Sequence, residues 1–172
     1  MRLLVCAIAA TIAAPAYAAV VETTANGLAI EEHVHVAATP DRVYAALIHP
    51  EKWWNPEHTF SHDAKNLSLD AKAGGCLCET LPNGGSVQHL TVAFAAPGKT
   101  LRFRGAMGPF QGEGVDGALT FSLTPKDGGT DLALAANWGG YFRGGFDRIA
   151  APADGMLTDL VTRVKQYAET AK

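Results

Sequence analysis

The sequence has little charge, and none of it is gathered into a run of one sign. Only 18% of its 172 residues are Asp, Glu, Lys or Arg, and the formal net charge at pH 7 is −3. Nucleic acids and anionic membranes attract clustered Lys and Arg residues, and this chain has no such cluster. We therefore expect neither nucleic acid nor an anionic membrane surface as a partner.

Beyond the N-terminal region, the sequence has no apolar stretch that approaches the roughly 20 residues needed to span a bilayer. The N-terminal region itself has Arg2, then an uncharged apolar run, then Ala16-Tyr17-Ala18. A basic start, an apolar run and an A-x-A site are typical of a secretory signal peptide. We predict a signal peptide over 1–18 with cleavage near Ala18, a periplasmic or secreted protein, and no stable membrane insertion.

Cysteine is scarce, and only Cys76 and Cys78 lie beyond the predicted signal peptide. Two cysteines cannot form the multi-bridge framework of many small exported domains. On an extended strand, side chains two residues apart have Cβ atoms about 7 Å from each other, whereas a disulfide requires about 3.5–4.5 Å. We therefore interpret both as small buried hydrophobic residues, with a redox or copper role as the alternative.

Known catalytic and cofactor motifs are also missing. The sequence contains no G-x-S-x-G, H-E-x-x-H or C-G-x-C-W pattern. His58 and His62 have the spacing of metal ligands on a helix, but the sequence places no third ligand beside them. Gly112, Gly114 and Gly117 match the dinucleotide fingerprint formally, but a strand follows them where a helix is required to receive the pyrophosphate. We assign no catalytic residue, no metal and no cofactor.

The first elements of the domain are predicted from alternation and capping signals. Residues 19–27 are small and polar and are expected to form a loose leader, and the alternation over 28–36 indicates a strand. Thr39 followed by Pro40 has the pattern of a helix N-cap and first turn, and a second short helix or turn is expected near residues 53–56. Two short helices therefore follow the first strand.

The rest of the chain predicts antiparallel strands and one long helix. Turn residues separate segments with a period of two, which is typical of hairpins. These segments are 76–81, 86–94, 100–104, 118–123 and 130–138. A helical apolar stripe then runs through the segment from about 149 to 170. We predict an α+β fold in which a curved antiparallel sheet of about six to seven strands wraps around the C-terminal helix, with 28–172 as a single domain.

Several segments, in order, resemble a known superfamily. They are 38–47 with 50–54, Ala73-Gly74-Gly75 with Glu79 four residues later, 92–101, and 119–134. Together they are similar to the START/polyketide-cyclase-like (SRPBCC) superfamily, nearest its heat-shock-protein ATPase activator-like branch, over roughly 28–170. The resemblance implies a helix-grip fold with a deep cavity. It also implies one of several functions, because the superfamily includes lipid carriers, hormone and polyketide binders, co-chaperone modules and enzymes.

The candidate ligand-binding residues are large aromatic side chains at strand ends and in loops, together with one carboxyl group on a strand. Aromatic side chains suit a pocket for an apolar guest, and a few polar groups orient it. The set is Trp53, Trp54, Phe60, Glu79, Phe103, Phe110, Trp138 and Phe142. The glycine-rich segment 105–117 is expected to form a lid that carries Met107 and Phe110. His89 is expected on the solvated face of its strand.

Glu32 and Glu79 are the carboxyl groups considered for acid chemistry, because burial on a strand face raises a carboxyl pKa. For Glu79 we favour an ion pair with Arg102 or Arg104, or plain exposure to solvent, over catalysis. The leading hypothesis is non-catalytic capture or transport of a small apolar molecule. The alternatives are a cyclase or hydratase that uses a pocket carboxylate or histidine, and a protein-interaction module with a collapsed pocket. No sequence pattern bears on the oligomeric state.

Overall fold

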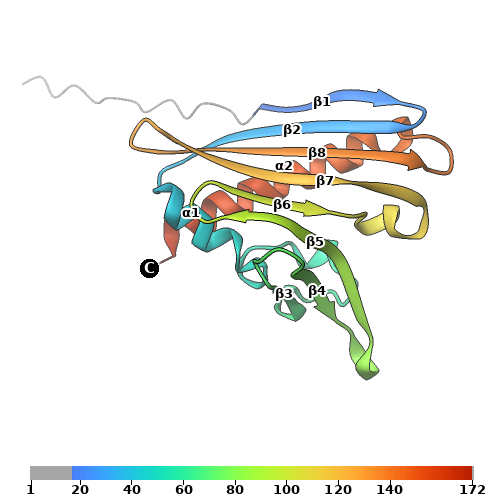
Figure 1. Cartoon of the computed structure of the whole chain (residues 1–172), viewed down its shortest axis with the longest axis horizontal. Helices are drawn as coiled ribbons and strands as arrows, with labels where there is room; N and C mark the ends of the chain where they lie inside the picture. Colours follow the sequence, from blue (N-terminus) through green and yellow to red (C-terminus); the bar gives the residue numbers. More distant parts are fainter. Residues whose placement is uncertain (1–16, 172) are drawn as a thin grey trace, which may run out of the picture.

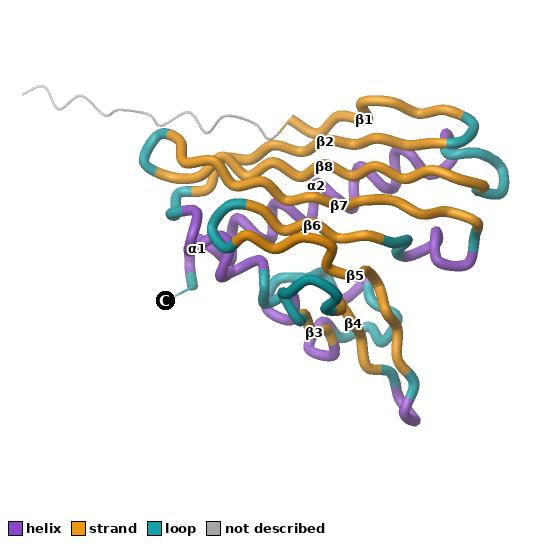
Figure 2. Tube along the Cα trace, viewed as in Figure 1, coloured by secondary structure: helices purple, strands orange, loops and turns teal. Residues whose placement is uncertain are grey.

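The computed structural model describes residues 17–171, in which eight strands and two α-helices follow one another along the chain. The α-helices and strands are β1 (Tyr17–Thr24), β2 (Gly27–Val36), α1 (Pro40–Leu47), β3 (Leu67–Leu69), β4 (Cys76–Thr80), β5 (Ser86–Ala96), β6 (Thr100–Arg104), β7 (Gly114–Lys126), β8 (Gly129–Tyr141) and α2 (Asp147–Thr170). Five short 3₁₀ turns lie in the connections: η1 (Pro50–Lys52), η2 (Pro56–His58), η3 (Ala64–Asn66), η4 (Pro82–Gly84) and η5 (Gly108–Gly112). Figure 2 shows short turns and loops around β3, β4 and the end of β5, and a further turn, η5, beside the end of β7.

The strands form one antiparallel sheet in the order β1-β2-β8-β7-β6-β5-β4-β3. Asp127 and Gly128 both have positive φ, and they join β7 to β8 in a two-residue turn between the paired Lys126 and Gly129. Such turns follow the right-handed twist of the strands they connect. The resulting long hairpin lies at the centre of the sheet, and α2 crosses behind it in Figure 1.

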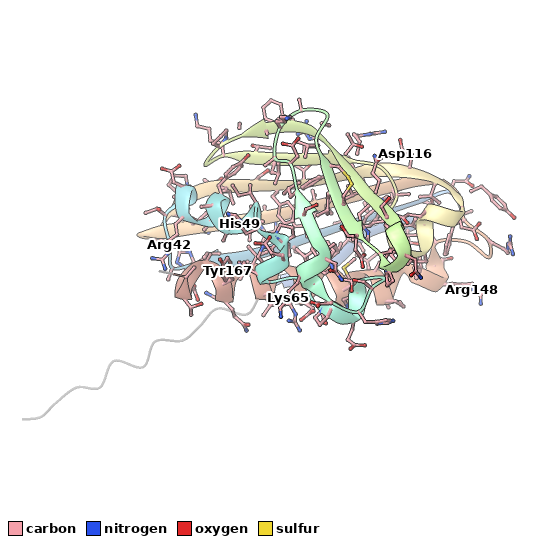
Figure 3. All side chains as sticks on the ribbon, turned by 90° about the horizontal axis from the view of Figure 1, so that it is seen from below. Arg42, His49, Lys65, Asp116, Arg148 and Tyr167 are labelled. Atoms are coloured by element: carbon pink, nitrogen blue, oxygen red, sulfur yellow. A yellow bond between two sulfur atoms is a disulfide. The ribbon has the colours of Figure 1, made fainter. Side chains whose placement is uncertain are left out.

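Helix α2 presents its predicted apolar stripe to the sheet. Leu157, Leu160, Val161, Val164 and Ala168 are all buried. At its C-terminal end, the guanidinium group of Arg42 donates hydrogen bonds to the carbonyl oxygens of Glu169 and Ala171, which no longer have partners within the helix. Figure 3 shows Arg42 and Tyr167 at this end of the molecule, and Asp116 and Arg148 at the other. The helix-grip α+β fold is therefore confirmed. No helix within 17–171 is long and apolar enough to cross a bilayer.

The two strands that the sequence did not predict, β1 and β3, form the two edges of the sheet. The expectation of a loose leader over 19–27 is wrong for its first six residues, because β1 pairs with β2 from Tyr17 to Thr24, with an irregularity between Val20 and Glu22. Edge strands gain backbone hydrogen bonds from one neighbour and need little apolar alternation. Most of the predicted signal peptide, residues 1–16, lies outside the described residues.

Strand β5 connects the main layer to a smaller one. Its C-terminal half pairs with β6, and its N-terminal half pairs with β4. The register shifts in both pairings, between Leu77 and Cys78 and between Val92 and Phe94. Bulges of this kind bend a strand and increase its twist. In Figure 1, β3, β4 and the N-terminal end of β5 accordingly project away from the layer formed by β1, β2, β8, β7 and β6.

Candidate functional site

A cavity of about 350 Å³ opens between β5, the loops that carry η2 and η5, and α2. Its volume lies within the roughly 300–1,000 Å³ that is usual for small-molecule sites. We call it the loop pocket. It is lined by Trp54, His58, Thr59, Phe60, His89, Met107, Gly108, Pro109 and Met156.

The walls of the loop pocket are mainly apolar. The indole of Trp54 is buried, whereas the ring of Phe60 is 53% exposed at the rim. Met107 comes from the segment before η5, and Met156 comes from α2. Unbranched methionine side chains adapt their shape to different guests and contact aromatic rings favourably. The pocket is therefore suited to a flat apolar molecule.

Local hydrogen bonds hold the η2 side of the loop pocket. The indole Nε1 of Trp54 donates to the carbonyl of His58 at 3.3 Å, and the hydroxyl of Thr59 donates to the carbonyl of Pro56 at 2.8 Å. The side-chain amide of Asn55 donates to Asp159 on α2 at 2.9 Å. The loop is thus tied to the helix, and the polar groups of Trp54 and Thr59 are already used.

The strand irregularity opposite Cys78 turns His89 toward the loop pocket. In the pairing of β4 with β5, Leu77 faces Leu90 and Cys78 faces Gln88, which leaves His89 as the extra residue of a bulge. A bulge interrupts the alternation of side chains between the two faces. His89 and Leu90 are therefore both buried, and the expectation that His89 is solvated is wrong.

Glu79 lies behind His89 and is only 1% exposed. One carboxylate oxygen accepts a hydrogen bond from the backbone N–H of Phe60 at 3.1 Å, and the other accepts one from that of Ser61 at 2.5 Å. Nε2 of His89 lies 2.8 Å from the first oxygen. Burial alone would raise the pKa of the Glu79 carboxyl, but the hydrogen bonds from Ser61, Phe60 and His89 outweigh it and hold that pKa below its usual value. Glu79 is therefore ionised at neutral pH.

The ionised carboxylate fixes the tautomer of His89. A carboxylate is only an acceptor, so Nε2 of His89 must carry the hydrogen that joins it to Glu79. Nδ1 has no hydrogen-bond partner among residues 17–171, and it is not one of the fully enclosed polar atoms. In the neutral imidazole, Nδ1 therefore keeps a free lone pair, and the side chain that carries it lines the loop pocket.

Glu32, the other carboxyl group considered, lies under α2 and does not line the loop pocket. Its Oε1 is 3.0 Å from the hydroxyl of Thr158, which is also 3.0 Å from the carbonyl of Asp154. One hydroxyl hydrogen cannot serve both, so the two contacts are satisfied together only when Glu32 is protonated and donates. Burial raises the pKa of Glu32 to about 7. A hydrogen bond donated by Thr158 to the ionised carboxylate would lower this pKa, whereas the negative charge of Asp154 raises it further.

The family is shown by a sequence comparison. A profile described as polyketide cyclase / dehydrase and lipid transport matches residues 28–169. The chain belongs to this family. The match confirms the START/polyketide-cyclase-like superfamily to which the sequence pointed, and its description associates the family with the binding of small molecules.

Solved structures with the same fold share little sequence with this family member. A protein from Rhizobium leguminosarum is 16% identical, with a TM-score of 0.60, and the match covers 83% of this chain and 95% of that one. A protein from Rhodobacter sphaeroides is 22% identical, with a TM-score of 0.58 and coverage of 91% and 100%. The Aha1 dimer from Colwellia psychrerythraea is 20% identical, with a TM-score of 0.54 and coverage of 84% and 98%. Such identities show the fold alone. A search of curated proteins finds no match.

The deep cavity that the superfamily implied is filled at its centre in this family member. Only about 10 Å³ remains among the side chains between the middle of the sheet and the helices. Those side chains include Trp53, Phe103 and Phe121, and the rings of Phe103 and Phe121 pack edge to face at 6.4 Å between centroids. The loop pocket, at the side of the core, is the mainly apolar space that stays open, whereas a wider hollow of about 490 Å³ beside α2 is lined partly by Lys52, Arg163 and Gln166.

The eight candidate residues divide into three groups. Trp54 and Phe60 line the loop pocket, and Glu79 holds His89 from behind. The structure places Trp53 and Phe103 in the core. The remaining three, Phe110, Trp138 and Phe142, join Phe146 in an aromatic cluster.

The aromatic cluster fixes the segment that carries η5. The ring centroid of Phe110 lies 5.2 Å from that of Trp138, 5.3 Å from that of Phe142 and 5.7 Å from that of Phe146. This anchors the segment to β8 and to the start of α2. Of the lid residues expected from the sequence, Met107 lines the loop pocket while Phe110 packs into the cluster.

Two expectations about β4 are corrected. Cys76 and Cys78 are partly exposed and form a disulfide, with Cα atoms 5.3 Å apart. The bulge at this point distorts the pairing of β4 with β5, so the spacing of a regular strand does not apply. The expected ion pair of Glu79 with Arg102 or Arg104 is also absent from the described residues, because Arg104 pairs with Asp116 and Arg102 lies over the ring of Phe94.

Sequence reasoning missed five lining residues, namely His58, Thr59, Gly108, Pro109 and Met156, and it misplaced His89. A proline-bounded loop and one methionine on a helix have no local pattern that distinguishes a pocket wall from surface. His58 and His62 gain no third ligand, and residues 17–171 contain no group of three or more His, Cys, Asp or Glu side chains that could hold a metal ion.

Proposed function

We propose that this protein binds one small, mainly apolar molecule in the loop pocket and carries or sequesters it unchanged. The observation that carries this proposal is an open 350 Å³ cavity with mainly apolar walls, to which two histidines, His58 and His89, contribute. An apolar cavity of about 150 Å³ holds benzene, so this pocket has room for a molecule of one or two rings. The family description, which includes lipid transport, supports the same conclusion.

The test uses naphthalene as the probe and isothermal titration calorimetry as the measurement. We expect the wild-type protein to bind naphthalene and the Met156→Trp variant, which fills the pocket from α2, to lose at least tenfold in affinity. The matched control is Val21→Trp, because Val21 is 57% exposed on β1, away from the pocket. Absence of heat in the wild type, or full binding by a correctly folded Met156→Trp variant, contradicts the proposal.

We propose further that the protein acts in an oxidising compartment, the periplasm or the exterior. Two observations support this: the signal-peptide pattern over 1–18 and the Cys76–Cys78 disulfide, which persists where the surroundings are oxidising. Cleavage after Ala18 removes the first two residues of β1 and leaves six of its eight. Cell fractionation with N-terminal sequencing tests it, and an uncleaved protein in the cytosolic fraction contradicts it.

The His89–Glu79 pair favours one second candidate, an acid–base enzyme. An imidazole oriented by a buried carboxylate is the usual arrangement of a general base. The discriminating substrate is 2-tetralone, a two-ring ketone whose α-hydrogens exchange with D₂O when a base removes them. Exchange accelerated by the wild type and not by the His89→Gln variant establishes the enzyme; equal exchange in both excludes this reaction. The third alternative, a protein-interaction module, expected the pocket between sheet and helix to be collapsed: that space is filled at its centre, whereas the loop pocket beside it is open, and we therefore favour ligand binding.

A further inference from the structure

We infer that the loop pocket selects neutral aromatic molecules that carry one hydroxyl group, and that the hydroxyl donates a hydrogen bond to Nδ1 of His89. This inference rests on the proposed function, since it names the ligand class of the same pocket. It follows from three observations: the tautomer of His89, the hydrogen bonds that already engage the other polar groups of the pocket walls, and the negative charge of Glu79 next to His89.

In the neutral imidazole of His89, Nδ1 is an acceptor because Nε2 carries the hydrogen that is bonded to Glu79, and Glu79 is held by three donors. The backbone N–H groups of Phe60 and Ser61 and the Nε2–H of His89 all converge on its carboxylate. Two of these donors belong to the backbone of the loop that also forms the pocket rim. The carboxylate therefore cannot rotate freely, and the ring of His89 is held with Nε2 toward Glu79 and Nδ1 on the opposite edge.

Few other polar side-chain groups on the pocket walls are free to orient a ligand. The hydroxyl of Thr59 is bonded to Pro56, and the indole N–H of Trp54 is bonded to His58. His58 is exposed to solvent, and its ring lies near enough to Asp159 to interact with the charge of that carboxylate. Nδ1 of His89 is thus an acceptor without a protein partner on a largely buried side chain of the pocket wall. A ligand hydroxyl can donate to it inside the pocket, where a hydrogen bond is better shielded from water.

The charge distribution argues for a neutral ligand. Within 17–171, no Lys or Arg side chain lines the loop pocket, and the ionised carboxylate of Glu79 lies 2.8 Å from Nε2 of His89. A ligand carboxylate would therefore be repelled by Glu79 without a cation to offset the repulsion. A phenolic hydroxyl carries the donor without the charge, and its ring matches the aromatic and methionine walls formed by Trp54, Phe60 and Met156.

Three probes of nearly equal size test the inference at pH 7: 1-naphthol, 1-methoxynaphthalene and 1-naphthoate. We expect 1-naphthol to bind about tenfold more tightly than 1-methoxynaphthalene, because one hydrogen bond contributes a free energy of about that size. We expect 1-naphthoate to bind most weakly. A pocket without an acceptor gives the opposite order for the first two, because the methyl ether is the more apolar. Tightest binding of the carboxylate, or of the ether, overturns the inference.

The variant His89→Gln keeps a donor for Glu79 while removing the ring acceptor. We expect it to bind 1-methoxynaphthalene as the wild type does and to lose most of the preference for 1-naphthol. A measurement on the wild type avoids dependence on the variant's folding: the ¹⁵N signal of His89 Nδ1 should move on addition of 1-naphthol and stay in place with 1-methoxynaphthalene. Equal shifts for both probes contradict the inference.

These outcomes separate the two proposals. If none of the three probes binds, the loop pocket is not a ligand site and the proposed function fails. If the ether and the naphthol bind equally in both proteins, the pocket binds apolar molecules and only the inference about the hydroxyl fails.

Discussion

The imidazole of His89 and the carboxylate of Glu79 lie 2.8 Å apart on neighbouring strands, and each side chain is less than a tenth exposed. The pairing depends on the bulge in β5, which adds one residue opposite Cys78 and turns His89 inward. It also depends on the loop before β3, whose backbone donates to the same carboxylate from Phe60 and Ser61. One buried charge thus links two strands, a loop and the wall of the pocket.

Replacement of Glu79 by Ala should destabilise the protein by about 3 kcal/mol. The substitution leaves two backbone N–H groups and the imidazole of His89 without their buried acceptor, and each such loss costs about 1–3 kcal/mol before the surroundings relax. The free energy of unfolding in urea is the measurement. The control is Asp116→Ala, which breaks the exposed pair with Arg104 and should cost under about 1 kcal/mol. Similar losses in the two variants would contradict the role of Glu79.

The pH dependence of stability should carry the signature of Glu32. Its pKa in the folded protein is raised to about 7, above that of the unfolded chain, so protonation favours the folded state. The stabilisation is complete below pH 4.5 and is lost as the pH rises through 7, by about 2 kcal/mol between pH 5 and pH 8. Glu32→Gln, which imitates the protonated group, should remove this decline when unfolding is measured at both pH values. The exposed neighbour gives the control: Glu31→Gln should keep the wild-type decline.

Glu79 should act in the opposite direction. Its pKa is below the usual value, so the stability it contributes is present above the pKa of the unfolded carboxyl and is lost as the pH falls through the folded pKa. The Glu79→Ala variant should therefore differ most from the wild type near neutral pH, and the difference should shrink in acid. Urea unfolding of both proteins along an acid series measures it, and a difference that grows toward low pH would contradict the assignment.

The sequence predicts the elements that bury an apolar face and misses those that do not. In helix α2 and the six inner strands, apolar residues recur with the period of a helix or a strand and so mark the buried face. The structure contains each of these elements. The edge strands β1 and β3 are held by backbone pairing with one neighbour, so their side chains carry no such pattern. The identity of the fold is therefore readable, while the extent of the sheet is not.

The pocket is less predictable because it depends on departures from regular structure. Alternation along β5 places His89 outside, and only the bulge opposite Cys78 brings it inside. The same irregularity accompanies the Cys76–Cys78 disulfide, which regular strand spacing excludes. The sequence offers aromatic residues at strand ends and in loops as one class, and that class does not distinguish Trp54 at the pocket from Phe110 in the aromatic cluster.

The Cys76–Cys78 disulfide should influence the pocket more than it influences global stability. It closes a loop of three residues, for which the chain-entropy relation gives only about 1.5 kcal/mol. Because it lies on β4 opposite the bulge, its loss should alter the position of His89. The double variant Cys76→Ser with Cys78→Ser should stay folded, with a urea midpoint lower by about 1 M, while its affinity for 1-naphthol falls several-fold. An unchanged affinity and an unchanged His89 ¹⁵N signal would show that the bulge does not need the disulfide.

Two buried tryptophans should respond differently to the same substitution. The indole Nε1 of Trp53 donates to the carbonyl of Ala46 at 2.9 Å, whereas that of Trp138 is enclosed without a hydrogen-bond partner among the described residues. Trp53→Phe removes a donor that has a partner and so loses one buried hydrogen bond, although the Ala46 carbonyl still accepts from the N–H of His49. Trp138→Phe removes a donor that is buried without a partner, so it loses no hydrogen bond. Both changes lose similar volume in the core. We therefore expect Trp138→Phe to be the milder by about 1–2 kcal/mol in the free energy of unfolding, and equal losses would show that the Trp138 indole has a partner in solution.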